Sequence, residues 1–330
     1  MGGNLFKLGR IGRERYFEIE TDLRVYLDGR IPDAYRIPRF YGSKADFGDV
    51  DIIVSDEVLA ESDWQTLRRE ISEDLGIERT ASTGHVFSTV YRDFQVDFFL
   101  RPAATFEATY NFLSFNDLGN LLGRIFRRLG LKYGEKGLEF VFRRAQASYR
   151  RDLPVSTDIK RILEFIELDH AIWRAGFETL DEMYAWLVTS PYFSVEPYRK
   201  LGATMRKRAS VRPTVARFLT WIEDEGVDKV CVYAPREVCF ARVCEAFPEA
   251  RLEEAICDEE AREARALAVR ERFRGDIVME LFPKLRGRPL GGFIKDFKET
   301  FTDFEAEVSA LSPEDVRKMI LGFGRARGDE

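Results

Sequence analysis

The chain has 330 residues, which is enough for one large or two medium domains with a sizeable core. Hydrophobic residues make up 45% and charged residues 33% of the chain, as is ordinary for a globular protein with a charged surface. The formal net charge of −6 excludes a protein that binds polyanions through its bulk charge, so any nucleic-acid contact must come from a local basic patch.

Targeting and cysteine signals predict a cytoplasmic protein with no membrane contact. No apolar run approaches the ~18 residues of a membrane span, and the N-terminal MGGNLFKLGR lacks the apolar region of a signal peptide. No pair of cysteines has Cys-x-x-Cys spacing and the chain has only two histidines, so we expect free thiols in a reducing compartment and no structural zinc site. The cysteines are Cys231, Cys239, Cys244 and Cys257.

The N-terminal part of the chain alternates between amphipathic helices and short apolar strands. Asp63 is the predicted N-cap of one helix, and Arg92-Asp93 separates two strand-like runs that predict a hairpin. The predicted elements are helices over 13–28 and 63–75, and strands over 35–41, 49–54, 85–91 and 94–100. This order predicts a small α+β head with a mixed sheet and helices on one face.

From about Asn116 the pattern becomes mostly helical, with a short hairpin predicted at 131–142. Pro154 is expected to break the chain, so we place a domain boundary near residue 150. Further helices are predicted over 116–130, 159–168, 169–175, 178–189, 213–224, 236–247 and 252–273. We therefore predict a catalytic α+β domain over 1–150 and an α-helical domain over 151–330 that binds substrate or nucleic acid.

The candidate site begins in the stretch YGSKADFGDVDIIV, residues 41–54. Side chains alternate between the faces of a strand, so Asp49 and Asp51 point the same way. Two carboxylates on one face of a buried strand are costly unless a positive charge lies between them. A pair of divalent cations would supply it, and oxygen ligands together with substrate phosphates suit Mg²⁺, with Mn²⁺ as the alternative.

Two further parts belong to the same candidate site. Asp97 interrupts the apolar run Phe94–Leu100 and is a third candidate ligand. Gly42 allows the backbone to approach a phosphate closely, and Ser43 adds a hydroxyl group and an N–H donor.

This pattern resembles the DNA polymerase β-like nucleotidyltransferase superfamily, which includes poly(A) polymerases, CCA-adding enzymes, antibiotic nucleotidyltransferases and some toxins. The shared parts are Gly42-Ser43, the Asp49-x-Asp51 pair at a strand start, and Asp97 in a later strand, all within residues 1–110. The spacer from Lys44 to Gly48 is shorter than is usual in the family.

The resemblance implies transfer of a nucleoside monophosphate from a nucleoside triphosphate, such as ATP, to an acceptor hydroxyl group. Asp49 and Asp51 would bridge two metal ions, one of which Asp97 would also hold. Gly42, Ser43 and Lys44 would hold the β- and γ-phosphates. The acceptor hydroxyl would lie on RNA, such as a tRNA 3′ end, with a protein or small molecule as the alternative.

Less specific interpretations of the same residues remain open. An Asp-x-Asp pair is often a solvated strand end, and an Asp within a strand is often simply hydrogen-bonded. The chain would then be a nucleotide-binding or interaction protein of the same fold without turnover. A toxin or defence protein that modifies host tRNA would share the chemistry.

A segment without acidic residues, 198–222, is the most basic part of the chain and a candidate nucleic-acid contact. Aromatic residues in or near this segment would stack bases, and these are Tyr192, Phe193, Tyr198 and Trp221. The alternative is a solvated loop that pairs with acidic helices such as 252–264. The cations of segment 198–222 are Arg199, Lys200, Arg206, Lys207, Arg208, Arg212 and Arg217. A second basic set, Arg124, Arg127 and Arg128, is more typical of an exposed helix face.

Overall fold

The computed structural model describes residues 5–59, 63–143, 150–199 and 212–329. The chain divides into two compact units, Met1–Ala250 and Arg251–Glu330. The boundary that we predicted near residue 150 lies inside the first unit, at the start of strand β10 (Arg150–Ser156). This strand pairs with β9 (Gly137–Arg143), so a division at 150 would separate two hydrogen-bonded strands.

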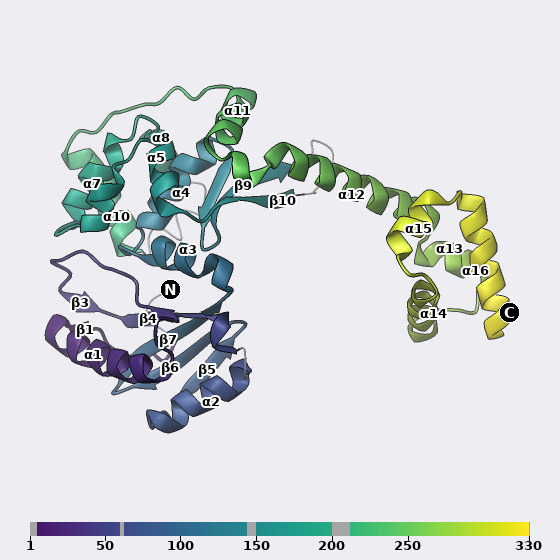
Figure 1. The fold of residues 1–330 in the computed structure, drawn as a ribbon, viewed down its shortest axis with the longest axis horizontal. Coiled ribbons are helices and arrows are strands. Elements are labelled where there is room, and N and C mark those ends of the chain that lie inside the picture. The colour runs from purple at the N-terminus through teal and green to yellow at the C-terminus, as the bar shows by residue number, and fades with distance from the viewer. Residues whose placement is uncertain (1–4, 60–62, 144–149, 200–211, 330) are drawn as a thin grey trace. The chain divides into compact units, whose positions relative to one another are not determined.

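A five-stranded mixed sheet organises the N-terminal part of the first unit, with the strand order β2-β4-β7-β6-β5 (Figure 1). Strands β4 and β7 are parallel neighbours, and the other pairs are antiparallel. The predicted hairpin is confirmed as β6 and β7, which are joined by Arg92 and Asp93, both with positive φ. The strands are β2 (Tyr35–Arg36), β4 (Asp49–Ser55), β5 (Thr80–Thr83), β6 (Val86–Tyr91) and β7 (Phe94–Arg101).

The two faces of this sheet have different partners. Helices α1 (Arg13–Arg30) and α2 (Trp64–Asp74) cover one face, and helix α3 (Ala103–Leu113) contacts β4 and β7 from the other (Figure 1). Alternate residues of the strands, such as Ile52 and Phe98, join α1 and α2 in one apolar cluster. The residues that alternate with these along each strand therefore point towards the opposite face of the sheet, where the predicted site lies.

The loop before β4 is attached to the start of α1. Strand β1 (Ile11–Gly12) pairs with β3 (Asp46–Phe47), and the ring of Phe47 stacks on Tyr16 of α1 at a centroid distance of 3.7 Å. Arg13 donates hydrogen bonds to the carbonyl groups of Gly42 and Lys44. These contacts fix the loop that leads into the first two carboxylates.

A three-stranded antiparallel sheet with the order β10-β9-β8 follows helix α4 (Leu118–Arg128). The predicted hairpin is confirmed as β8 (Leu131–Gly134) and β9. Strand β10 was not predicted, because we expected Pro154 to break the chain. Pro154 instead lies in an edge strand, where its missing N–H group disrupts the sheet least, and the pairing register shifts after it.

Helices complete both units, and they include the helices predicted over 159–168, 169–175, 178–189, 213–224, 236–247 and 252–273. In the first unit these are α5 (Ile159–Phe165), α6 (His170–Ala175), α7 (Leu180–Thr189), α8 (Glu196–Arg199), α10 (Pro213–Asp224) and α11 (Arg236–Ala246), and the 3₁₀ turns are η1 (Asp56–Leu59) and η2 (Pro248–Ala250). The second unit contains α12 (Leu252–Arg272), α13 (Gly275–Leu281), α14 (Arg288–Glu299), α15 (Phe304–Ala310) and α16 (Pro313–Arg327) around its own phenylalanine-rich core. In the described ranges, no helix combines the length and apolar character needed to cross a bilayer.

Candidate metal centre

Three carboxylates converge where the two parallel strands of the sheet begin. Asp51 of β4 lies directly beside Asp97 of β7 in the strand register, and Asp49 lies two residues earlier on the same face. Each of the three side chains offers an oxygen atom, and these atoms all lie within 4.8 Å of one another. The sequence pattern therefore predicted a real cluster of acidic side chains.

The electrostatics of the cluster favour a bound cation. Burial raises the pKa of Asp51 well above its ordinary value, and the neighbouring charges of Asp49 and Asp97 raise it further. Like charges that are held together away from water cost free energy unless a positive charge compensates them. Lys44 is the nearby cation of the loop, but burial lowers its pKa, and Asp49 only partly offsets this effect.

Asp97 has one oxygen atom that the described part of the chain leaves without a partner. Its Oδ2 accepts a hydrogen bond of 2.9 Å from Nε2 of Gln95, whereas its buried Oδ1 has no hydrogen-bond partner. A buried polar atom without a partner is rare and calls for an explanation such as an ion. Three carboxylates with one unpaired oxygen fit a divalent cation with a preference for hard oxygen ligands, such as Mg²⁺ or Mn²⁺.

Gln95 is a residue of the site that we did not predict. It is 2% exposed, and its Oε1 accepts a hydrogen bond of 3.1 Å from the N–H group of Leu5. It therefore fixes the orientation of the Asp97 carboxylate from within the same strand. The signal was present in the sequence, since Gln95 is a polar residue two positions before Asp97 in an apolar run.

The predicted phosphate loop is held in a different way from our expectation. The N–H groups of Gly42 and Ser43 donate hydrogen bonds of 2.8 and 2.7 Å to the carbonyl groups of Phe177 and Glu178. In this structure they are therefore not free to bind a phosphate. A Cβ atom at Gly42 would lie 1.9 Å from Oε2 of Glu178, so a larger residue here would require the end of this flexible side chain to move aside.

The remaining groups of the loop are the hydroxyl group of Ser43 and the ammonium group of Lys44. Nζ of Lys44 lies 4.4 Å from the ring centroid of Phe47 and 5.6 Å from that of Phe40. These ring faces stabilise the ammonium group next to the carboxylate cluster. A phosphate at this loop would thus be bound by side chains rather than by the backbone.

The predicted nucleic-acid segment is only partly described. Lys200, Arg206, Lys207 and Arg208 lie outside the described residues. Arg199 donates a hydrogen bond of 3.2 Å to the carbonyl group of Val227, and Arg212 forms an ion pair of 2.6 Å with Asp117. Arg217 pairs with Asp181 at 3.1 Å, so the three described cations of this candidate contact are already engaged within the chain.

The aromatic side chains beside that segment differ from the prediction. Phe193 and Tyr198 are 0% and 1% exposed and pack against Phe218. The expectation that these two rings stack bases is therefore wrong, because they belong to the core of the first unit. Trp221 stacks on Phe218 with nearly parallel rings.

The chain matches no protein-family model and no curated protein sequence. Among solved structures it is similar to the polymerase beta of Leishmania infantum in a ternary gap complex, with a TM-score of 0.33 and 17% sequence identity. The similar region covers 41% of this chain and 52% of that polymerase, so the chain spans about half of its length. The likeness is too distant to carry an argument, and the interpretation of the site depends on its geometry.

Proposed function

We propose that this chain is a metal-dependent nucleotidyltransferase that moves a nucleoside monophosphate from a nucleoside triphosphate to an acceptor hydroxyl group. The observation that supports the proposal is the convergence of Asp49, Asp51 and Asp97 within 4.8 Å, together with the unpartnered Oδ1 of Asp97. Divalent cations held by these residues would neutralise the phosphates and lower the pKa of the acceptor hydroxyl group.

Each residue of the site has a defined part in this proposal. Asp49 and Asp51 would bind two ions from adjacent positions of one strand face, and Asp97 would bind one of them from the neighbouring strand. Gln95 would keep the Asp97 carboxylate oriented through its 2.9 Å hydrogen bond. Lys44 and the hydroxyl group of Ser43 would meet the β- and γ-phosphates.

The reaction exchanges a phosphoanhydride bond of the nucleoside triphosphate for a phosphoester bond to the acceptor. The acceptor oxygen forms a bond to the α-phosphorus, the bond from that phosphorus to the bridging oxygen breaks, and pyrophosphate leaves. The acceptor proton passes to solvent. We propose an RNA hydroxyl group, such as a tRNA 3′ end, as the acceptor.

A second candidate function has one observation in its favour. Because the N–H groups of Gly42 and Ser43 are engaged with Phe177 and Glu178, this conformation offers fewer phosphate donors than the sequence predicts. Fewer donors would stabilise the charge on the leaving pyrophosphate less well, as expected of a nucleotide-binding protein without turnover.

Labelled nucleotides distinguish the two functions. Purified protein is incubated with Mg²⁺, bulk tRNA and each α-labelled nucleoside triphosphate in turn, alongside an Asp49→Asn/Asp51→Asn variant. Asp93→Asn is the matched control, because Asp93 is an exposed carboxylate in the turn of the same hairpin as Asp97.

Label on RNA with the wild type and the control, but not with the double variant, would support transfer. Mg²⁺-dependent nucleotide binding without release of pyrophosphate would support the second function. Equal transfer by all three proteins would contradict the metal-site assignment.

A further inference from the structure

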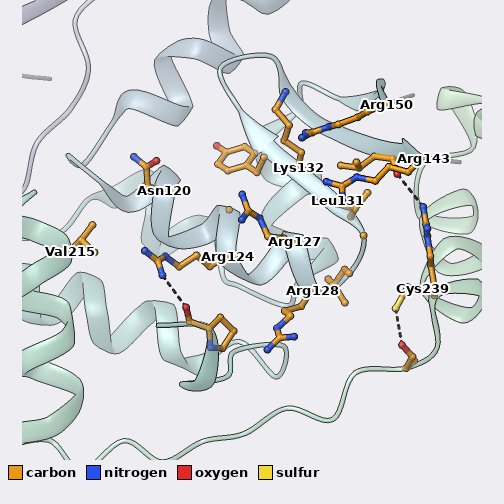
Figure 2. A pocket seen from close by; sticks show the side chains of 18 of the residues that line it. Asn120, Arg124, Arg127, Arg128, Leu131, Lys132, Arg143, Arg150, Val215 and Cys239 are labelled. Carbon is orange, nitrogen blue, oxygen red and sulfur yellow. Dashed lines mark hydrogen bonds between the residues drawn. The ribbon is translucent and has the colours of Figure 1, made fainter. Parts of the chain in front are cut away.

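A cavity of about 960 Å³ lies within the first unit and is lined by α4, by the β8–β10 sheet and by residues from the segment 197–239. Helix α4 contributes Arg124, Arg127 and Arg128 to its wall, at the i, i+3 and i+4 spacing that places side chains on one helix face. Figure 2 shows these three side chains among those that line the pocket, with Arg124 directed towards the carbonyl group of Pro197. From the sequence alone we took them for an ordinary exposed helix face.

Cations from other elements meet those of α4 around the same space. The sheet contributes Lys132, Arg143 and Arg150, and Arg212 and Arg236 also line the cavity. In Figure 2 the labelled cations of the sheet lie across the pocket from the arginines of α4. Among the described lining residues there are eight cations and no carboxylate.

Neighbouring carboxylates neutralise only part of this charge. Lys132 forms ion pairs with Glu139 at 2.6 Å and with Asp152 at 2.9 Å, and Asp152 also pairs with Arg150 at 3.0 Å. The third carboxylate is Asp117, which pairs with Arg212. Eight cations against three carboxylates leave a surplus of five positive charges in a protein with a net charge of −6.

Three arginines of the cavity have no hydrogen bond or ion pair in the part of the chain that the structure describes, and one of them, Arg128, lies over the ring of Tyr233 at 5.7 Å. Arg127 of α4 and Arg143 of β9 are exposed, and no hydrogen bond or ion pair of the described residues involves either guanidinium group. Arg124 donates only to the carbonyl group of Pro197, at 3.0 Å. Its pKa is lowered by burial and also by the charge of Arg127. Such like charges, held together, favour a bound anion.

We propose that this cavity binds a compact polyphosphate, a small molecule that carries about five negative charges on adjacent phosphate groups. Guanidinium groups have a planar fork that matches phosphate oxygens in two-point hydrogen bonds. The volume lies at the upper end of the range for a single small ligand, about 300–1,000 Å³. Charge, shape and donor type thus all fit one ligand class.

A strand of nucleic acid fits this cavity less well. It carries one negative charge per nucleotide, so five charges would bring five sugars and bases into the same space. Grooves for single strands also present aromatic rings on which bases stack. Tyr133 is the aromatic residue among the described lining residues, and it is 7% exposed and packs edge-on against Phe112.

The site is separate from the carboxylate cluster and does not depend on the proposed transfer reaction. The described lining residues begin at Asn120 and include none of Asp49, Asp51 and Asp97. Binding is therefore measured with EDTA present, so that metal-dependent binding at the carboxylates does not contribute.

Isothermal titration of the full chain with inorganic tripolyphosphate tests the proposal, with a single-stranded RNA decamer as a second probe. The variant is Arg127→Gln/Arg143→Gln, which removes two exposed guanidinium groups and leaves the ion pairs of the cavity intact. Arg174→Gln is the matched control, because Arg174 is an exposed arginine of α6 outside the cavity. Circular dichroism melting shows that both variants are folded.

We expect one tripolyphosphate to bind per wild-type chain, and the double variant to bind it about 30-fold or more weakly, since two charge-assisted donors are lost. The control should bind as the wild type does. Absence of binding to the wild type, or unchanged binding by the double variant, would overturn the proposal. RNA that binds more tightly than tripolyphosphate and depends on Arg127 and Arg143 would also overturn it, in favour of a nucleic-acid cleft.

Discussion

Asp51 is the most strongly perturbed residue of the candidate site, because it is buried between two other carboxylates. Its pKa in the folded protein lies well above the value in the unfolded chain. The protonated form is therefore favoured in the folded state, and the free energy of unfolding decreases as the pH rises through the folded-state pKa. Without metal, ionisation of Asp51 therefore destabilises the folded protein.

Replacement of this carboxylate should stabilise the metal-free protein. We expect Asp51→Asn to raise the free energy of unfolding at pH 7 by about 1–3 kcal/mol, because the amide has a similar shape but no charge. For a unit of this size, each kcal/mol raises Tm by about 2–4 °C. Thermal melts in EDTA between pH 5 and 8 check this expectation.

The change with pH in the Tm difference between Asp51→Asn and the wild type is the control for this prediction. The Tm advantage of Asp51→Asn should grow as the pH rises, since only the wild type then acquires the buried charge. Added Mg²⁺ should raise the Tm of the wild type more than that of the variant. A variant that is less stable than the metal-free wild type at every pH would show that Asp51 has stabilising partners instead.

Gln95 should act on metal affinity through the orientation of Asp97. In Gln95→Met the hydrogen bond to Oδ2 of Asp97 is lost while the side-chain volume is nearly kept. We expect the Mg²⁺ concentration for half-maximal thermal stabilisation to rise about tenfold, the lower end of the usual effect for residues that orient metal ligands. Gln65→Met, at an exposed position of α2, is the matched control. Equal Mg²⁺ responses of the two variants would argue against a positioning role.

Elements with local signals were predicted well from the sequence. Helix α10 was predicted with its bounds, 213–224, because apolar spacing and a proline in the first turn are features of the segment itself. Strand β10 was missed, because a strand that contains Pro154 exists only through its pairing with β9. Helix α3 was also outside the predicted elements.

The same distinction separates the predicted and unpredicted parts of the sites. Asp49, Asp51 and Asp97 could be chosen from local signals, namely strand alternation and a carboxylate inside an apolar run. The parallel pairing of β4 with β7, which brings them together, is not local. The attachment of Gly42 to Phe177 joins residues that are far apart in the sequence, and no short-range pattern indicates it. The basic cavity likewise collects cations from α4, three strands and the segment 197–239, each of which alone resembles ordinary surface.

The turn between β8 and β9 should depend on one glycine. Gly137 has a φ of +85°, and a Cβ atom there would lie 2.3 Å from the backbone oxygen of Ser156 in β10. We expect Gly137→Ala to lower the free energy of unfolding by about 2–4 kcal/mol, because both the backbone conformation and the clash are unfavourable. Urea unfolding followed by circular dichroism measures the change.

Gly29 of α1 is the control for that measurement, because its replacement by alanine should have the opposite effect on stability. It lies in a helix, and a Cβ atom at this position would have no neighbouring atom within 4 Å. Gly29→Ala should therefore stabilise the protein by about 0.5–1 kcal/mol. Similar effects of the two substitutions would contradict the packing seen around Gly137.

At the scale of the whole molecule, the two compact units have separate cores. The first unit holds the apolar cluster between α1, α2 and the five-stranded sheet, as well as the site residues. The second unit has a cluster of its own that includes Phe282, Phe293 and Phe297. Chains divide into such units when each part buries enough apolar surface to fold.

Truncation should distinguish the observed division from the boundary predicted near residue 150. We expect a fragment of residues 1–250 to melt cooperatively and to keep the Mg²⁺-dependent rise in Tm, because the described site residues and the strands that carry them lie within it. A fragment of residues 1–149 lacks β10, and so exposes the edge of β9 and the apolar residues beneath it. It should aggregate or melt without cooperativity. If the shorter fragment instead melts cooperatively and responds to Mg²⁺ as the full chain does, the sheet of β8–β10 is dispensable and the N-terminal domain ends near 150.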